Sequence, residues 1–253
     1  MKYASYIGRG GIAMFNGTVY QGGKLYYEIP VGILCLESYF PKMRGHLRNP
    51  HTYSFPTVMS VIKGLDIPKL LFNPAQEMAQ PLIDAAKQLE RDGVKAITGS
   101  CGFMALFQKE IAEAVSIPVF MSSLLQLPLI RIMHGEKANI GILTASKNAL
   151  TPRHLEACRV DWDSVTVEGM EGNLEFWETI IEGKRTDFNV PKLEREIVGT
   201  ALRFIETGKL DALLLECTDL APFARQIQEQ SHVPVYDINS LMMLVHSTVR
   251  WKI

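Results

Sequence analysis

From residue 30 onward, short apolar runs alternate with stretches whose apolar residues recur at helical spacing. The runs have the length that is typical of buried parallel strands. We expect strands at 31–36, 68–73, 94–100, 117–123, 138–145, 164–170, 211–217 and 233–238. We expect helices at 81–93, 103–115, 151–160, 173–182 and 191–207, with further helices after residues 123, 217 and 238. This alternation predicts an α/β fold in which helices cover both faces of parallel sheets.

Two segments of this pattern repeat one another. Shifted by 116 residues, the segment from Ala96 (AITGSCGFMALFQKEIAEAVSIPVF) aligns without a gap with the segment from Ala212 (ALLLECTDLAPFARQIQEQSHVPVY). Each segment predicts a strand, a cysteine, a helix and a second strand, and the shift pairs Cys101 with Cys217. A repeat of this kind indicates duplicated substructures.

The matched cysteines indicate a chemical role. Each follows a predicted strand and precedes a predicted helix, and ligands of open α/β sheets bind at that edge. Because a helix N-terminus stabilises a thiolate, we expect the pKa of both thiols to be lowered. If the two halves face one another about a pseudo-dyad, one thiolate and one thiol can invert a carbon next to a carboxylate, with backbone N–H groups holding the carboxylate.

Composition narrows the class of protein. The 253 residues are 47% hydrophobic and carry a net charge of −1, which indicates no strongly basic surface for nucleic acid or for a membrane. No apolar run is long enough to cross a membrane, and MKYASYIGRGG lacks the apolar core of a signal peptide. The four cysteines include no CxxC pair, so we expect a cytoplasmic protein with reduced thiols, in which Cys35 and Cys158 are buried core residues.

A long polar loop, residues 37–56, follows the first predicted strand, and loops of this length inside compact domains are often functional. It contains Arg44, Arg48, His46 and His51. Solvated loop residues are the simpler interpretation of all four, although the arginines would attract an anionic substrate and the histidines can reach the cleft. The six histidines do not show the spacing of a metal site.

The chain from about Val31 to about Val249 resembles the aspartate/glutamate racemase superfamily, which also contains hydantoin racemases, arylmalonate decarboxylases and maleate isomerases. The second cysteine motif, ECTDL, is similar to the family's Gly-Cys-Thr followed by Glu or His. The resemblance implies two pseudo-symmetric α/β lobes, each a mainly parallel sheet flanked by helices, with the active site in the cleft between them. It also implies catalysis without pyridoxal phosphate, a metal or another cofactor.

We place the first lobe at residues 30–135 and 236–253 and the second at residues 136–235. Residues 1–29 are an N-terminal extension, in which TVYQGGKLYYEIP predicts a β-hairpin around Gly22 and Gly23. The hairpin is a candidate dimer arm, and we leave a homodimer open.

By the resemblance, Cys101 and Cys217 are the acid/base pair, and Thr218 binds the substrate carboxylate. The first motif departs from the family, because Gly102 and Phe103 stand where Asn and Thr are usual, which argues against aspartate and glutamate as substrates. The candidate substrate-binding residues, taken from the two cysteine motifs, GILTAS and GILCLESYFPK, are Ser100, Gly102, Thr144, Ser146, Thr218, Asp219, Glu37 and Ser38.

We therefore expect a cofactor-independent racemase or epimerase, an isomerase that moves protons at the α-carbon of a small carboxylate or amino-acid derivative. One alternative is a decarboxylase or cis–trans isomerase of the same superfamily that uses one cysteine. Another is a non-catalytic small-molecule-binding protein on this scaffold. Retention of both cysteines favours the racemase, and the absence of the usual polar residues after Cys101 favours the binding protein. The expected partner is a small carboxylate.

Overall fold

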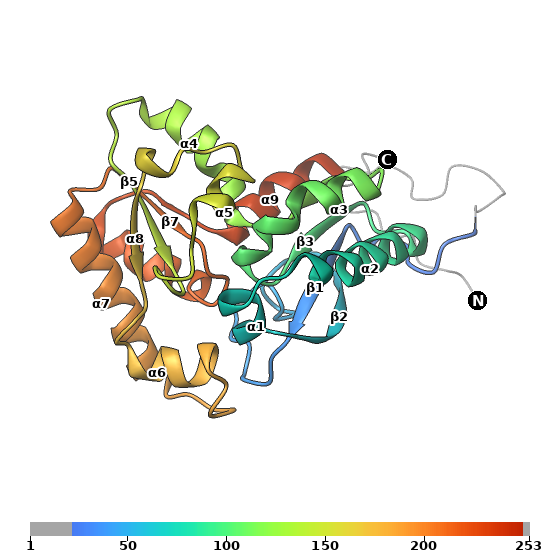
Figure 1. Ribbon diagram of the computed structural model, residues 1–253, viewed down its shortest axis with the longest axis horizontal. Coiled ribbons are helices and arrows are strands. Elements are labelled where there is room, and N and C mark those ends of the chain that lie inside the picture. Colours follow the sequence, from blue (N-terminus) through green and yellow to red (C-terminus); the bar gives the residue numbers. More distant parts are fainter. Residues whose placement is uncertain (1–21, 250–253) are drawn as a thin grey trace, which may run out of the picture.

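The computed structural model describes residues 22–249, which form two parallel β-sheets with helices packed against them (Figure 1). The strands are β1 Val31–Glu37, β2 Thr57–Asp66, β3 Ala96–Gly99, β4 Val119–Phe120, β5 Ile140–Thr144, β6 Thr166–Gly169, β7 Ala212–Leu215 and β8 Val235–Tyr236. The α-helices are α1 Ile67–Phe72, α2 Ala79–Asp92, α3 Gln108–Ala114, α4 Leu127–His134, α5 Pro152–Glu156, α6 Leu174–Phe176, α7 Val190–Gly208, α8 Ala224–Ser231 and α9 Ile238–Val249. Shorter 3₁₀ helices include Gly102–Phe107 and Ala221–Phe223, and a π-helical turn spans Trp177–Ile181.

The two sheets share one strand order. The first runs β2-β1-β3-β4 and the second β6-β5-β7-β8, and every neighbouring pair is parallel. The predicted repeat is confirmed in its strands, because the same shift of 116 residues carries β3 onto β7 and β4 onto β8. Figure 1 shows the first sheet on the right and the second on the left, so the predicted two-lobed α/β fold is confirmed.

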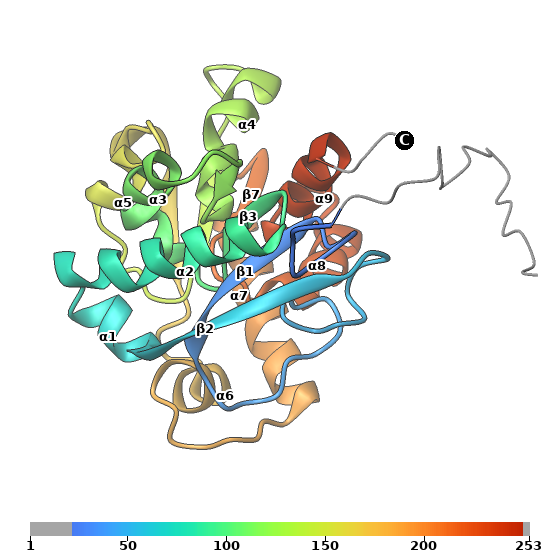
Figure 2. The same cartoon turned by 90° about the vertical axis from the view of Figure 1, so that its right-hand side faces the viewer.

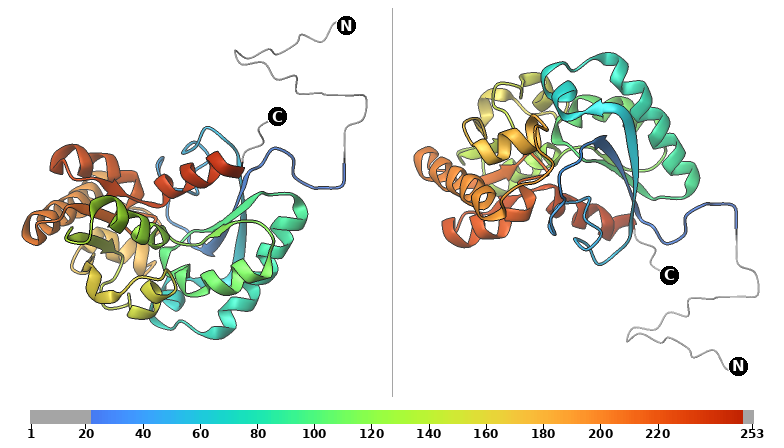
Figure 3. Two further views of the ribbon diagram at one scale, coloured as in Figure 1. Left: turned by 90° about the horizontal axis from the view of Figure 1, so that it is seen from above. Right: turned by 90° about the horizontal axis from the view of Figure 1, so that it is seen from below.

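Strand β1 is buried on both faces, as a central strand of a parallel sheet must be. Leu34 and Leu36 point into the large hydrophobic core that also contains side chains of α2. Ile33 and Cys35 point the other way, into a second cluster that contains Met242 of α9. Figure 3 (left) shows the same layering, with α9 on one side of the first sheet and α2 and α3 on the other.

One predicted strand is wrong. Residues 68–73 lie in helix α1 and its C-cap. The edge strand that pairs with β1 is β2, which precedes residues 68–73 in the sequence (Figure 2). The helix starts here because Asp66 caps it, accepting a hydrogen bond from the backbone N–H of Lys69 at 2.9 Å, and because Pro68 suits a first turn. Strand β2 has exposed Met59 and Val61, as an edge strand permits, so it lacks the unbroken apolar run of a central strand.

The predicted helix ends agree with the structure better than this strand does. Gly93 ends α2 with a φ of 119°, a conformation that favours glycine, and Thr151 with Pro152 starts α5. Residues 22–30 contain no strand, and the rest of the predicted N-terminal hairpin lies outside the described residues. Across residues 22–249, the helices all fall short of the length and apolarity needed to cross a membrane.

Candidate active site

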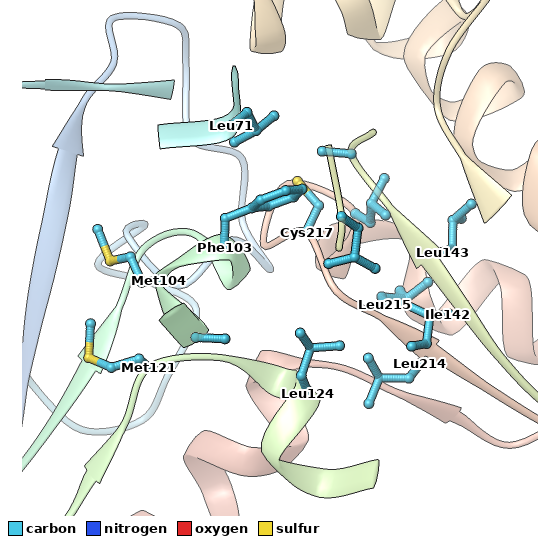
Figure 4. Close-up of a cluster of buried hydrophobic side chains, with 14 of the residues drawn as sticks. Leu71, Phe103, Met104, Met121, Leu124, Ile142, Leu143, Leu214, Leu215 and Cys217 are labelled. Atoms are coloured by element: carbon cyan, nitrogen blue, oxygen red, sulfur yellow. The ribbon is translucent and has the colours of Figure 1, made fainter. Parts of the chain in front are cut away.

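A pocket lies where the carboxyl ends of β3 and β7 approach each other. Cys101 follows β3 and Cys217 follows β7, and both thiols line this pocket. The other polar lining residues are Ser38, Lys42, His46, Arg48, Ser100, Thr218 and Asp219. Figure 4 shows Phe103 of the first lobe and Cys217 of the second within one cluster of buried side chains. The site therefore draws residues from both lobes.

Equivalent hydrogen bonds place the two cysteines. The backbone N–H of Ser100 donates to the Leu34 carbonyl and that of Glu216 donates to the Leu143 carbonyl, each at 2.9 Å, so each cysteine leaves its sheet at the same point. The Thr218 hydroxyl then donates to the Ser100 carbonyl at 2.8 Å, which joins the two motifs across the lobe boundary.

Cys217 has a carboxylate beside it. The Cys217 thiol lies 4.0 Å from Oδ2 of Asp219, as a weak donor, and Nε2 of His46 lies 3.3 Å from Oδ1. The Arg48 backbone N–H donates to Nδ1 of His46 at 2.9 Å, so the ring proton of neutral His46 belongs on Nε2, facing Asp219. Burial lowers the pKa of His46 and favours its neutral form. Burial would raise the pKa of Asp219, but Lys42 and His46 hold it below its usual range, so this carboxylate is ionised.

Two cationic side chains of loop 37–56 line the same pocket. Within residues 22–249, the buried Nζ of Lys42 and the buried Nε of Arg48 have no hydrogen-bond partner. Lys42 lies over the Phe40 ring, and burial lowers its pKa to about 8. Arg48 is held by its Nη1, which donates to the Ser38 hydroxyl at 2.7 Å and to the Leu36 carbonyl at 3.2 Å. Buried donors without a partner are costly, and an anion in the pocket would satisfy them.

The prediction that helix starts lower the pKa of both thiols is wrong. Burial raises the pKa of each thiol well above its ordinary value, and neighbouring carboxylates add to the rise, mainly Glu216 for Cys101 and Asp219 for Cys217. Helix dipoles do not offset this, because a 3₁₀ segment follows Cys101 and α3 begins only at Gln108. Both thiols are therefore protonated near neutral pH.

Other predicted site residues are turned to structural partners. The Thr144 hydroxyl donates to Oε2 of Glu216 at 2.7 Å, and the Ser146 hydroxyl donates to Glu171 at 2.8 Å. Gly102 is buried against Glu216. Glu37 accepts a hydrogen bond from the Gly64 backbone N–H at 2.8 Å and lines an adjoining hollow instead. Ser38, Ser100, Thr218 and Asp219 are the predicted binding residues that line the cysteine pocket.

Sequence reasoning overlooked two residues. Lys42 stands in the long loop between noted residues, but nothing in the local pattern indicated that its ammonium would be buried. Glu216 lies in the ECTDL motif, and its departure from the family's Gly at that position is the feature that could have identified it. Among the described residues, groups of three or more His, Cys, Asp or Glu side chains that could hold a metal ion are absent.

The apolar wall of the pocket comes from both lobes. It is formed by Ile67 and Leu71 of α1 in the first lobe and by Ile180 and Ile181 of the π-helical turn in the second. Such turns inside helices are frequent at functional sites.

A sequence model of the Asp/Glu/hydantoin racemase family matches residues 37–243. The chain belongs to this family. Among curated proteins, it is 31% identical to dimethylsulfoniopropionate lyase from Durusdinium sp. clade D, over 82% of this chain and 70% of that protein. It is also 31% identical to dimethylsulfoniopropionate lyase 3 from Emiliania huxleyi, over 82% of this chain but only 56% of that protein.

Solved structures of the family share the fold. Unliganded arylmalonate decarboxylase matches with a TM-score of 0.53 at 12% identity, over 88% of this chain and 93% of that one. Allantoin racemase from Pseudomonas fluorescens matches with a TM-score of 0.54 at 15% identity, over 87% and 91%. At these identities the likeness establishes the two-lobed architecture and leaves the reaction to the site itself.

Proposed function

We propose that the protein is a cofactor-independent lyase that eliminates the β-substituent of a small carboxylate, with dimethylsulfoniopropionate as its leading substrate. The similarity to dimethylsulfoniopropionate lyases over 82% of the chain supports this class. The observation that carries the proposal is the meeting of two thiols and two cationic donors in one pocket. Such a pocket holds a carboxylate and presents a base to the carbon beside it.

The reaction removes a proton from the carbon next to the carboxylate. The electron pair of that C–H bond becomes the carbon–carbon double bond, and the bond between the β-carbon and sulfur breaks. Sulfur keeps the electron pair of the broken bond, so dimethyl sulfide leaves neutral and acrylate remains. The departing sulfide needs no proton, and one base on one face of the substrate is sufficient.

The pocket provides a group for each part of this substrate. Lys42 and Arg48 bind the carboxylate and stabilise the negative charge that builds on it as the proton leaves. Cys217, as the thiolate, is the base, and ionised Asp219, held by His46, accepts a hydrogen bond from the thiol that forms when the substrate proton is taken. The positive sulfonium group favours the Cys217 thiolate when it enters the pocket. The four apolar wall residues contact its methyl groups.

A racemase or epimerase is the second candidate, and the retention of Cys101 opposite Cys217 favours it. Two-base inversion asks for similar acid/base groups on the two faces of the carbon. Here Cys217 lies beside Asp219, which lines the pocket, whereas Glu216, the carboxylate that acts mainly on Cys101, does not line it. This difference between the two thiols favours a reaction that uses one face of the substrate carbon.

The test is incubation of the purified protein with dimethylsulfoniopropionate, measuring dimethyl sulfide in the headspace and acrylate by NMR. We expect the two products in equal amounts, and a loss on the order of 100-fold or more in Cys217→Ala. Cys158→Ala, a buried thiol outside the pocket, is the matched control and should keep full activity.

Other outcomes have clear meanings. Exchange of the α-hydrogen for deuterium in D₂O without release of a sulfide, lost in both Cys101→Ala and Cys217→Ala, would establish the racemase instead. Saturable binding of small carboxylates without exchange or elimination would establish the binding protein.

A further inference from the structure

Glu216 is a buried acid whose role the reaction above leaves open. It directly precedes Cys217, is 1% exposed, and does not line the pocket. Its Oε2 accepts a hydrogen bond from the Thr144 hydroxyl at 2.7 Å, and the Ala145 backbone N–H also favours the ionised carboxylate. Among residues 22–249, its other oxygen, Oε1, is buried without a hydrogen-bond partner. Leaving such an oxygen unpaired is costly, which favours a functional explanation.

The same oxygen lies against the residue that follows Cys101. A Cβ placed on Gly102 would fall well inside contact distance of both Oε1 and the backbone oxygen of Glu216. Glycine is therefore required at position 102, because a Cβ there would collide with the backbone of residue 216 as well as with the carboxyl of Glu216.

We propose that Glu216 is a positioning residue for Cys101: its carboxyl, wedged against Gly102, and the Cys101 thiol act as a coupled pair, so that one of the two groups ionises at a time. The proposal concerns any reaction that uses Cys101, and it does not depend on the substrate. It also gives the unpartnered Oε1 a role, because a protonated Oε1 favours a thiolate at Cys101.

The charges around the pair support this coupling. Cys101 faces Glu216 and, less strongly, Asp219, while Thr144 and Ala145 present only uncharged donors to the carboxylate. Burial raises the pKa of Glu216 to about 7. Two buried acids that interact in this way titrate as a pair, and the second ionises only at a higher pH than the first. The Cys217 thiol differs, because Asp219 affects it more than Glu216 does.

Each thiol depends mainly on a different carboxylate, Cys101 on Glu216 and Cys217 on Asp219, and this difference provides the experiment. Wild type, Glu216→Gln and Asp219→Asn are alkylated with iodoacetamide from pH 6 to pH 10, and mass spectrometry reads the rate at Cys101 and Cys217 separately. Gln at 216 is isosteric and mimics the protonated acid. We expect Cys101 to react faster at pH 8 in Glu216→Gln, on the order of tenfold or more. Cys217 should respond more to Asp219→Asn.

Controls separate this effect from a change in folding. Glu206→Gln removes an exposed carboxylate on α7 and should leave both alkylation profiles unchanged. Thr144→Val removes the hydroxyl that stabilises ionised Glu216, so it should raise Cys101 reactivity in the same direction while leaving Glu216 in place. This second variant decides the question if Glu216→Gln does not fold.

A Cys101 profile that is the same in Glu216→Gln, Thr144→Val and wild type would overturn the proposal. An equal shift of the alkylation profiles of Cys101 and Cys217 would overturn it as well. Such a result would show that Glu216 acts on both thiols through its charge alone and is not paired with Cys101. Because the readout is alkylation, neither result depends on whether dimethylsulfoniopropionate is the substrate.

Discussion

Replacing Lys42 by methionine should raise the stability of the protein while weakening its hold on anionic substrates. Methionine keeps the unbranched length of the lysine stem and removes the charge. The Lys42 ammonium is buried, and Phe40 supplies only a ring face beneath it. Asp219 attracts this charge without a hydrogen bond to it, so the buried ammonium costs folding free energy, which a carboxylate bound directly to it would offset.

The magnitude follows from the pKa of Lys42, about 8 in the folded protein against an ordinary value of 10.5. Each pKa unit corresponds to about 1.4 kcal/mol, so the charged side chain costs on the order of 3 kcal/mol below pH 8, or about 2 kcal/mol after allowing for partial solvent screening. The unfolded chain binds the proton more tightly, so wild-type stability should rise as the pH increases from about 8 to 10.5.

Lys42→Met should therefore melt roughly 4–8 °C higher at pH 7, with the difference shrinking toward pH 10. The lost charge-assisted hydrogen bond should raise KM for a carboxylate substrate by roughly 10- to 100-fold. Lys63→Met, on the exposed part of β2, should change neither quantity. A lower melting temperature, or an unchanged KM, in Lys42→Met would refute the placement of this ammonium as the carboxylate anchor.

Three further changes test the site and its support. Asp219→Asn removes the carboxylate that accepts a hydrogen bond from the Cys217 thiol, so kcat should fall on the order of 100-fold with little change in KM, as steady-state kinetics would show. Buried His154 has a folded pKa of about 4, so stability should fall by about 2–3 kcal/mol as the pH drops from 6.5 to 4. His154→Gln should flatten that loss in urea unfolding. Gly141→Ala places a Cβ against the side chains of Leu210 and of Phe204 in α7, and should lower stability by about 1–3 kcal/mol in thermal melts.

The parts of the fold that the sequence predicted are those where one local pattern decides the outcome. The repeat predicted the strands around both cysteines, because buried parallel strands are short unbroken apolar runs. Strand β2 was missed because an edge strand exposes one side, so its residues show no such run. Residues 68–73 were assigned wrongly because a short apolar stretch fits a strand or a helix equally well, and the cap from Asp66 decided it.

The site was predicted only in part, because its electrostatics depend on long-range packing. Spacing identified Cys101 and Cys217, but the direction of their pKa shifts depends on burial and on carboxylates brought in by the fold. Lys42 could not be selected among the charged residues of loop 37–56, since exposure distinguishes it from Arg44 and sequence does not show exposure. Glu216 could have been found from its motif, by asking what glutamate in place of glycine requires of the facing segment.

The pocket combines a duplicated part with a part that occurs once. The repeat supplies one thiol from each lobe in equivalent positions, which suits chemistry on two faces of a carbon. Loop 37–56 belongs to the first lobe alone, and it places Lys42, His46 and Arg48 around Cys217 and Asp219. A carboxylate bound by this loop is held in one orientation, with a single face toward the supported thiol. We propose that the loop turns a scaffold suited to inversion toward elimination, so that exchanging its charged residues is a more direct route to changing the reaction than altering either cysteine.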